Sequence, residues 1–140
     1  MERKRSAILR IESTEISIEE MSEITGRQPD TSRRKGSSTR NPQRPLRTNV
    51  WELREDVGQD EYLGLALERL WPRILPAEAG MAQLARRGCI LRLALVQWIS
   101  DADPHEPGFG IGPRELGFLA SIGALLDVDQ YAASGSTRDL

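Results

Sequence analysis

The sequence predicts one small α+β domain, because strand-like and helix-like segments alternate along a chain of 140 residues. That length suits a single domain, residues 1–140, and is too short for two ordinary ones. Hydrophobic residues make up 39% of the chain and charged residues 29%, which indicates a modest core with additional polar segments. We expect the core to form around the three tryptophans, Trp51, Trp71 and Trp98.

The first part of the chain predicts a strand, a helix and a second strand. Residues 7–12 predict a strand, because apolar and charged residues alternate from Leu9 to Glu12, which is typical of a half-buried strand. Ser17 and Glu20 then form a capping box, and Gly26 is placed to end the helix in a left-handed conformation. Alternation returns over residues 50–54 and predicts the second strand.

A helical insertion is expected after this second strand. Leu63, Leu67 and Leu70 recur at the spacing that places side chains on one face of a helix. Pro72 is expected to break that helix, because proline lacks the N–H of the helical ladder. A further short helix is expected to end at Gly88.

The last part of the chain resembles the first. Residues 89–99 are apolar on both faces and predict a central strand. Pro113 suits the first turn of a helix that ends at Gly123, and residues 125–131 predict the last strand before a frayed tail over 132–140. Two similar strand–helix–strand segments predict a ferredoxin-like sandwich of two β-α-β units, with the helical insertion between the second and third strands.

Composition and spacing exclude several classes of function. A formal net charge of −2 provides no overall attraction to nucleic acid or to an anionic membrane. Cys89 is the single cysteine, which rules out an intrachain disulfide and a four-cysteine zinc site. The sequence contains no phosphate-binding loop and no nucleophile elbow, so we expect no enzyme activity and no cofactor.

The location is also predicted from composition. No apolar run approaches the roughly 20 residues that a membrane helix needs. The apolar stretch near the N-terminus, residues 7–9, is too short for a signal peptide. We therefore expect a cytoplasmic protein.

A basic segment is the strongest charge asymmetry in the chain. Residues 1–54 carry 12 basic and 8 acidic groups, whereas residues 55–140 carry 7 basic and 13 acidic groups. We interpret residues 27–49 as a long, partly flexible basic loop that binds a protein partner. Its candidate binding residues are Arg33, Arg34, Lys35, Arg40, Arg44 and Arg47. Weak nucleic-acid binding by the same loop, over 27–47, is an alternative, although no aromatic residue is interleaved there for base stacking.

The last predicted strand supplies a second candidate partner-binding surface. Strand alternation places Asp127, Asp129 and Tyr131 on one face. Leu126 and Val128 are expected to pack beneath them. These three residues would form a polar recognition face. Acid–base work is an alternative, since two carboxylates this close could do it if they were buried.

A metal-dependent or small-ligand activity is the remaining alternative. It would use the loop over residues 101–106 together with the last strand, because Asp101, Asp103 and His105 are potential metal ligands. Their spacing matches no known metal motif, and His105 is the only histidine. Our first expectation is therefore that the protein holds no metal.

Three stretches of the chain also resemble a known family. Residues 50–53, 67–72 and 123–131, together with the step Arg34-Lys35-Gly36, are similar to the bacterial domain-of-unknown-function family 4279. Members often have Trp just before the basic pair, where this chain has Arg33. The resemblance spans roughly residues 6–131 and implies a small stand-alone bacterial domain without established catalytic residues.

We therefore expect a non-enzymatic protein-interaction domain, acting as an immunity or regulatory partner of another protein. This expectation requires the fewest chemical groups that the sequence lacks. A ferredoxin-like fold would not decide between functions, since that fold hosts many unrelated ones.

Overall fold

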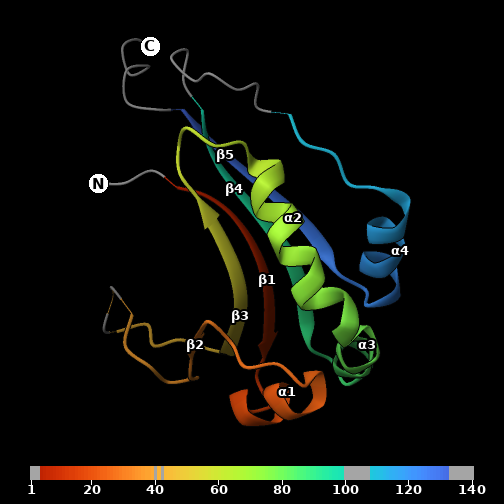
Figure 1. Ribbon diagram of the computed structural model, residues 1–140. Coiled ribbons are helices and arrows are strands. Elements are labelled where there is room, and N and C mark those ends of the chain that lie inside the picture. The colour runs from red at the N-terminus through yellow and green to blue at the C-terminus, as the bar shows by residue number, and fades with distance from the viewer. Residues whose placement is uncertain (1–3, 40, 42, 100–107, 133–140) are drawn as a thin grey trace.

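The computed structural model describes residues 4–39, 41, 43–99 and 108–132. These residues form a five-stranded sheet with helices packed on one of its faces. Figure 1 shows α2 and α4 on one side of the sheet and α1 and α3 near its lower end.

The strand order in the sheet is β2-β3-β1-β4-β5. β1 (Arg5–Ser13) lies in the centre and pairs antiparallel with both β3 (Asn49–Val57) and β4 (Ile90–Ile99). β5 (Leu125–Ala132) pairs parallel with β4 at one edge. The short β2 (Thr31–Arg33) pairs antiparallel with β3 at the other edge.

Helices connect these strands and cover one face of the sheet. Their bounds are α1 (Ile18–Thr25), α2 (Leu63–Ile74), the 3-10 turn η1 (Leu75–Ala77), α3 (Glu78–Arg86) and α4 (Pro113–Ser121). α2 packs on β1 and β3, whereas α3 contacts α1, α4 and β4. No described helix is long and apolar enough to span a bilayer.

The hydrophobic core lies between the sheet and this helical layer. Alternate residues of β1, namely Ala7, Leu9 and Ile11, are fully buried beneath the helices. Trp51 of β3 is fully buried as well, and its indole N–H donates to the hydroxyl of Ser22 on α1 at 3.1 Å. Strand alternation thus places one set of side chains in the core and the other on the opposite face.

Two of the predicted signals for α1, the Ser17 N-cap and the Gly26 C-cap, are confirmed, whereas the Glu20 carboxylate of the predicted capping box accepts from Arg87 at 2.9 Å instead. The Ser17 hydroxyl accepts a hydrogen bond from the Glu20 backbone N–H at 3.0 Å. Gly26 has φ of 70° and caps the C-terminus in the left-handed region. Pro72, in contrast, does not end its helix, because α2 continues to Ile74. Pro72 is exposed, so the helix tolerates the missing backbone donor on its solvent side.

The α+β class and the helical insertion between β3 and β4 are confirmed, but the ferredoxin-like arrangement is not. That arrangement separates the two parallel strands of each β-α-β unit by another strand. Here β1 and β3 are antiparallel neighbours, and β4 and β5 are parallel neighbours. The predicted loop over 27–49 also contains β2, and Ala132 still belongs to β5.

Candidate functional site

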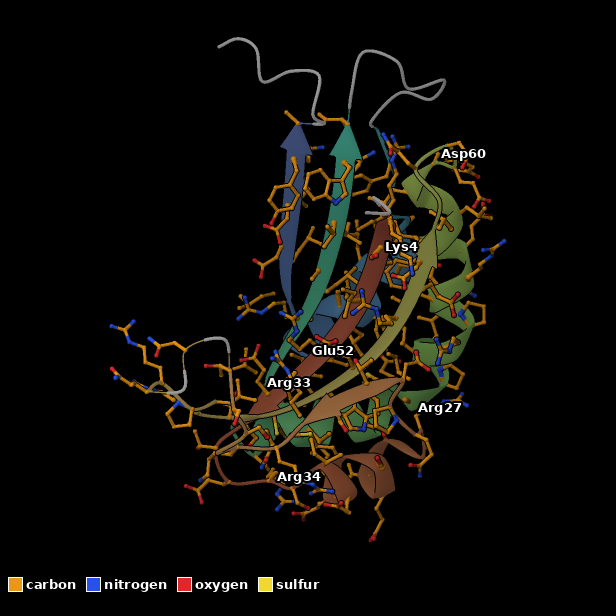
Figure 2. The ribbon with its side chains drawn as sticks, turned by 90° about the vertical axis from the view of Figure 1, so that its left-hand side faces the viewer. Lys4, Arg27, Arg33, Arg34, Glu52 and Asp60 are labelled. Atoms are coloured by element: carbon orange, nitrogen blue, oxygen red, sulfur yellow. The ribbon has the colours of Figure 1, made fainter. Side chains whose placement is uncertain are left out.

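The face of the sheet opposite the helices carries the candidate site. It presents the even-numbered residues of β1, β3 and β4 and the odd-numbered residues of β2 and β5, as the strand registers show. We call this surface the open face. Figure 2 views it directly, with Arg33 and Glu52 labelled near its lower half.

A hollow of about 330 Å³ lies on the open face where β2, β3 and β1 meet. Its centre is Glu52 of β3, whose side chain is largely buried. Arg10 of β1 donates from Nε to Oε2 of Glu52 at 2.5 Å, and the Thr31 hydroxyl donates to Oε1 at 2.9 Å. The Arg54 guanidinium lies 3.5 Å from the same Oε1. The Glu52 carboxylate therefore contacts two arginine side chains and, through Thr31, fixes β2 against β3.

The hollow is electropositive. Its lining contains the guanidinium groups of Arg10, Arg33 and Arg54 and a single carboxylate, that of Glu52. Arg33 is exposed, and its side chain makes no hydrogen bond or ion pair within the described part of the chain. Because Glu52 already accepts from several donors, the spare hydrogen-bonding capacity belongs to the arginines. Such an arrangement binds carboxylate or phosphate groups.

Two of the predicted binding residues in the basic segment are used inside the molecule. Both terminal nitrogens of Arg34 bond the carboxylate of Glu19 on α1, which lowers the pKa of Glu19 to about 2 and raises the pKa of Arg34. The Lys35 ammonium donates to the carbonyl of Thr14 at 2.9 Å. Arg34 and Lys35 therefore position the segment as well as presenting charge.

The other predicted basic residues differ in what the structure shows of them. Arg44 and Arg47 are exposed, and their side chains have no partner among the described residues. Arg40 lies outside the described residues. Arg44 and Arg47 do not line the hollow, whereas Arg33 does.

Asp127, Asp129 and Tyr131 lie at the opposite edge of the sheet, on β5. Asp127 accepts from Arg92 of β4 at 2.6 Å. The Tyr131 ring stacks on Trp98 with centroids 4.8 Å apart. Because β3, β1 and β4 separate β5 from β2, the acidic and basic residues predicted from sequence form two separate groups.

The packing predicted beneath these acidic residues was wrong. Leu126 and Val128 are 46% and 44% exposed, although they lie on the helix-covered face of the sheet. The helical layer covers β1, β3 and β4 but leaves β5 largely uncovered. β5 is therefore exposed on both of its faces.

The residues suggested for a metal site, Asp101, Asp103 and His105, lie outside the described residues. Within the described part of the chain, no three His, Cys, Asp or Glu side chains are grouped so that they could hold a metal ion.

Sequence reasoning missed Arg10, Glu52 and Arg54 as members of one site. A signal was present, because all three alternate with apolar residues in predicted strands and so had to face away from the core. Their convergence depends on the pairing of β1 with β3, in which Arg10 is opposite Glu52.

The family comparison covers nearly the whole chain. Residues 3–133 match the family described as a domain of unknown function, DUF4279. The chain belongs to the DUF4279 family. Comparison with curated proteins and with solved structures finds no significant match. Membership in DUF4279 therefore assigns no activity, and the functional argument depends on the geometry of the open face.

Proposed function

We propose that this DUF4279 domain is a non-enzymatic protein-interaction domain that binds an acidic segment of a partner protein in the hollow of the open face. The observation that carries the proposal is the convergence of Arg10, Arg33 and Arg54 on a sheet face that no described helix covers. A bacterial immunity or regulatory protein in the cytoplasm is the biological role that we infer for such a domain.

The chemistry of the hollow favours binding over catalysis. Among the described residues, Glu52 is the only carboxylate that lines it, and the Glu52 oxygens accept from Arg10 and Thr31 and lie near Arg54. Because these donors already occupy its oxygens, Glu52 is poorly placed to exchange a proton with a substrate in the hollow. Guanidinium groups, in contrast, form paired hydrogen bonds to carboxylates and are frequent hot spots of protein interfaces.

An acidic protein segment fits the open face better than a nucleic-acid backbone does. Glu12 and Asp56 lie on the same face, on either side of the row that contains Arg10 and Glu52. These carboxylates would repel a continuous row of phosphates, whereas a protein segment can place its acidic side chains only where the arginines are. The described aromatic pair, Trp98 and Tyr131, is at the far edge and provides no stacking surface beside the hollow.

Affinity purification from the native cell tests the proposal with three tagged baits: the wild-type domain, Arg33→Glu and Arg86→Glu. Arg86 is the matched control, because it is exposed at the end of α3 and its side chain has no described partner. A specific partner should be recovered with the wild type and with Arg86→Glu. It should be lost with Arg33→Glu, since reversal of a hot-spot charge costs at least tenfold in affinity, about 1.4 kcal/mol.

Two results of the affinity purification would contradict the proposal. Repeated recovery of the wild-type domain alone, or equal recovery of one partner by all three baits, would contradict binding at the hollow. A titration of a single-stranded oligonucleotide at increasing salt tests the nucleic-acid alternative separately. Tight binding that weakens steeply with salt would support a phosphate-dominated mode instead.

A further inference from the structure

β5 is an edge strand that presents apolar side chains on both of its faces. Leu125, Leu126, Val128 and Tyr131 are each at least 44% exposed. No described strand lies beyond β5, so the outer row of its backbone N–H and C=O groups has no partner strand within the described residues. Figure 2 shows β5 alone at that side of the sheet. Such an edge is a template for pairing with another strand.

A second copy of the chain pairs poorly with this edge in the three registers centred on residues 127 to 129, which lie in the middle of β5. A two-fold antiparallel pairing keeps each face of the sheet continuous, so odd-numbered residues of one β5 meet odd-numbered residues of the other. When Val128 lies on the two-fold axis, Asp127 of each copy is opposite Asp129 of the other copy. When Asp127 or Asp129 lies on the axis, that aspartate is opposite the same aspartate of the other copy. Like charges directly opposite each other destabilise a strand pair.

The same charges select a different occupant. Asp129 is exposed, and its side chain has no ion-pair or hydrogen-bond partner in the described part of the chain. Asp127 shares a single cation, Arg92, with Glu12. Cross-strand neighbours of these aspartates would therefore be lysine or arginine, and a cation could also lie on the Tyr131 ring. On the other face of β5, Leu126 and Val128 would be matched by apolar residues.

We propose that β5 accepts an extended segment of a partner protein as a sixth strand, with lysine or arginine at alternate positions and apolar residues between them. Main-chain hydrogen bonds along the outer edge supply the affinity, and the alternation of charge supplies the register. This surface is separate from the hollow, and it does not depend on the function proposed for the hollow.

A peptide titration followed by NMR tests this proposal. The probe is an eight-residue, acetylated and amidated peptide in which lysine and valine alternate. Its binding should shift the amide signals of residues 125–132 and slow their hydrogen exchange, while the signals of residues 31–33 stay in place. A counterpart with glutamate in place of lysine should not bind. Shifts confined to other strands, or equal binding of both peptides, would overturn the proposal.

Two variants with the same change in net charge distinguish binding at the β5 edge from general electrostatic attraction between the peptide and the protein. Asp129→Lys should weaken binding of the lysine peptide at least fivefold. Glu68→Lys changes the net charge equally, and Glu68 is an exposed residue of α2, which packs over β1 and β3. This control should leave the affinity within twofold of the wild type. Equal weakening by both variants would show that only net charge matters, and it would overturn docking at β5.

Backbone methylation tests whether the peptide pairs as a strand. Two further probes carry N-methyl groups on every lysine or on every valine, so each blocks the hydrogen bonds of one edge of the peptide. If the lysine side chains lie on the open face, only one edge of the peptide pairs with β5. The probe that is methylated on the other edge should therefore bind like the parent, and the probe that is methylated on the pairing edge should not bind. Equal binding by both, or loss of binding by both, would overturn strand addition.

Discussion

The Arg73 guanidinium on α2 donates to Oδ1 of Asp30 at 2.8 Å and thereby ties the helical layer to the segment that leads into β2. The same group donates to Glu55 at 2.8 Å and to the carbonyl of Arg54 at 3.1 Å. Asp30 in turn accepts from the Arg54 backbone N–H through Oδ2 at 2.8 Å. Asp30 and Arg73 therefore hold β2 and its hollow against β3.

The first prediction concerns the acid dependence of folding. Hydrogen bonding from Arg73 and from the Arg54 backbone lowers the pKa of Asp30. Since this folded-state pKa lies below the unfolded value, the stabilisation is fully present above a pH of about 4 and is lost as pH falls through the folded-state pKa. Asp30→Asn should cost about 1 kcal/mol at neutral pH, and it should lose less stability than the wild type between neutral pH and pH 3.

Urea unfolding followed by circular dichroism at several pH values measures both effects. Asp60→Asn serves as the control, because Asp60 is exposed and its side chain has no hydrogen bond among the described residues. If the wild type and Asp30→Asn lost the same stability in acid, Asp30 would not be held by Arg73 in solution.

The second prediction concerns two helical glycines whose replacement by alanine should change the stability of the protein in opposite directions. A Cβ on Gly80 of α3 would collide with the backbone carbonyl of Ile24, whereas a Cβ on Gly117 of α4 would meet nothing within 4 Å. Alanine normally stabilises a helix over glycine by about 0.5–1 kcal/mol. We expect that gain for Gly117→Ala. Gly80→Ala should instead cost about 1–3 kcal/mol, because α1 and α3 must separate.

Thermal and urea unfolding of the two single variants decides this point. A stabilised Gly80→Ala variant would mean that the close approach of α1 to α3 is not present in solution. Gly117→Ala reports the intrinsic effect of the substitution without that approach.

Local elements of this fold were largely predictable from sequence, because their signals are local. The caps of α1 depend on Ser17 and Gly26, and the inner position of β4, between β1 and β5, follows from apolar residues on both of its faces. The strand order was not predictable. It depends on long-range pairing of β1 with β3 and β4, and similar strand–helix–strand patterns are compatible with several orders.

The candidate site was predictable only in part for the same reason. Arg33 was identified from local charge, and it lines the hollow. Arg10 and Arg54 come from strands far apart in sequence, so their meeting at Glu52 required the register of the sheet. The exposure of Leu126 could not be predicted from the alternation of side chains along the strand. Alternation predicts which face of the sheet a residue lies on, but it does not predict which strand the helices leave uncovered.

The third prediction concerns a fully buried arginine. Arg5 at the start of β1 donates to the carbonyl of Glu61 at 2.9 Å and to the carbonyl of Trp98 at 3.2 Å. It thus joins β1, the end of β4 and the segment before α2. Arg5→Met should cost about 2–4 kcal/mol in urea unfolding, because the carbonyl groups of Glu61 and Trp98 lose a donor that is itself fully buried. Lys4→Met is the matched control at an exposed neighbour and should stay within about 0.5 kcal/mol. A cost below 1 kcal/mol for Arg5→Met would contradict the bridging role.

The fourth prediction concerns the single thiol. Cys89 is buried just before β4, and burial raises its pKa, so less of it is the reactive thiolate at any given pH. We expect its reaction with Ellman's reagent at pH 8 to be roughly 100-fold slower in the folded protein than in denaturant, because access requires opening of the core. If global unfolding controls access, the reaction in Gly80→Ala should accelerate about tenfold for each 1.4 kcal/mol of stability lost. A folded-state rate equal to that of a free thiol would contradict the packing of Cys89 against the core.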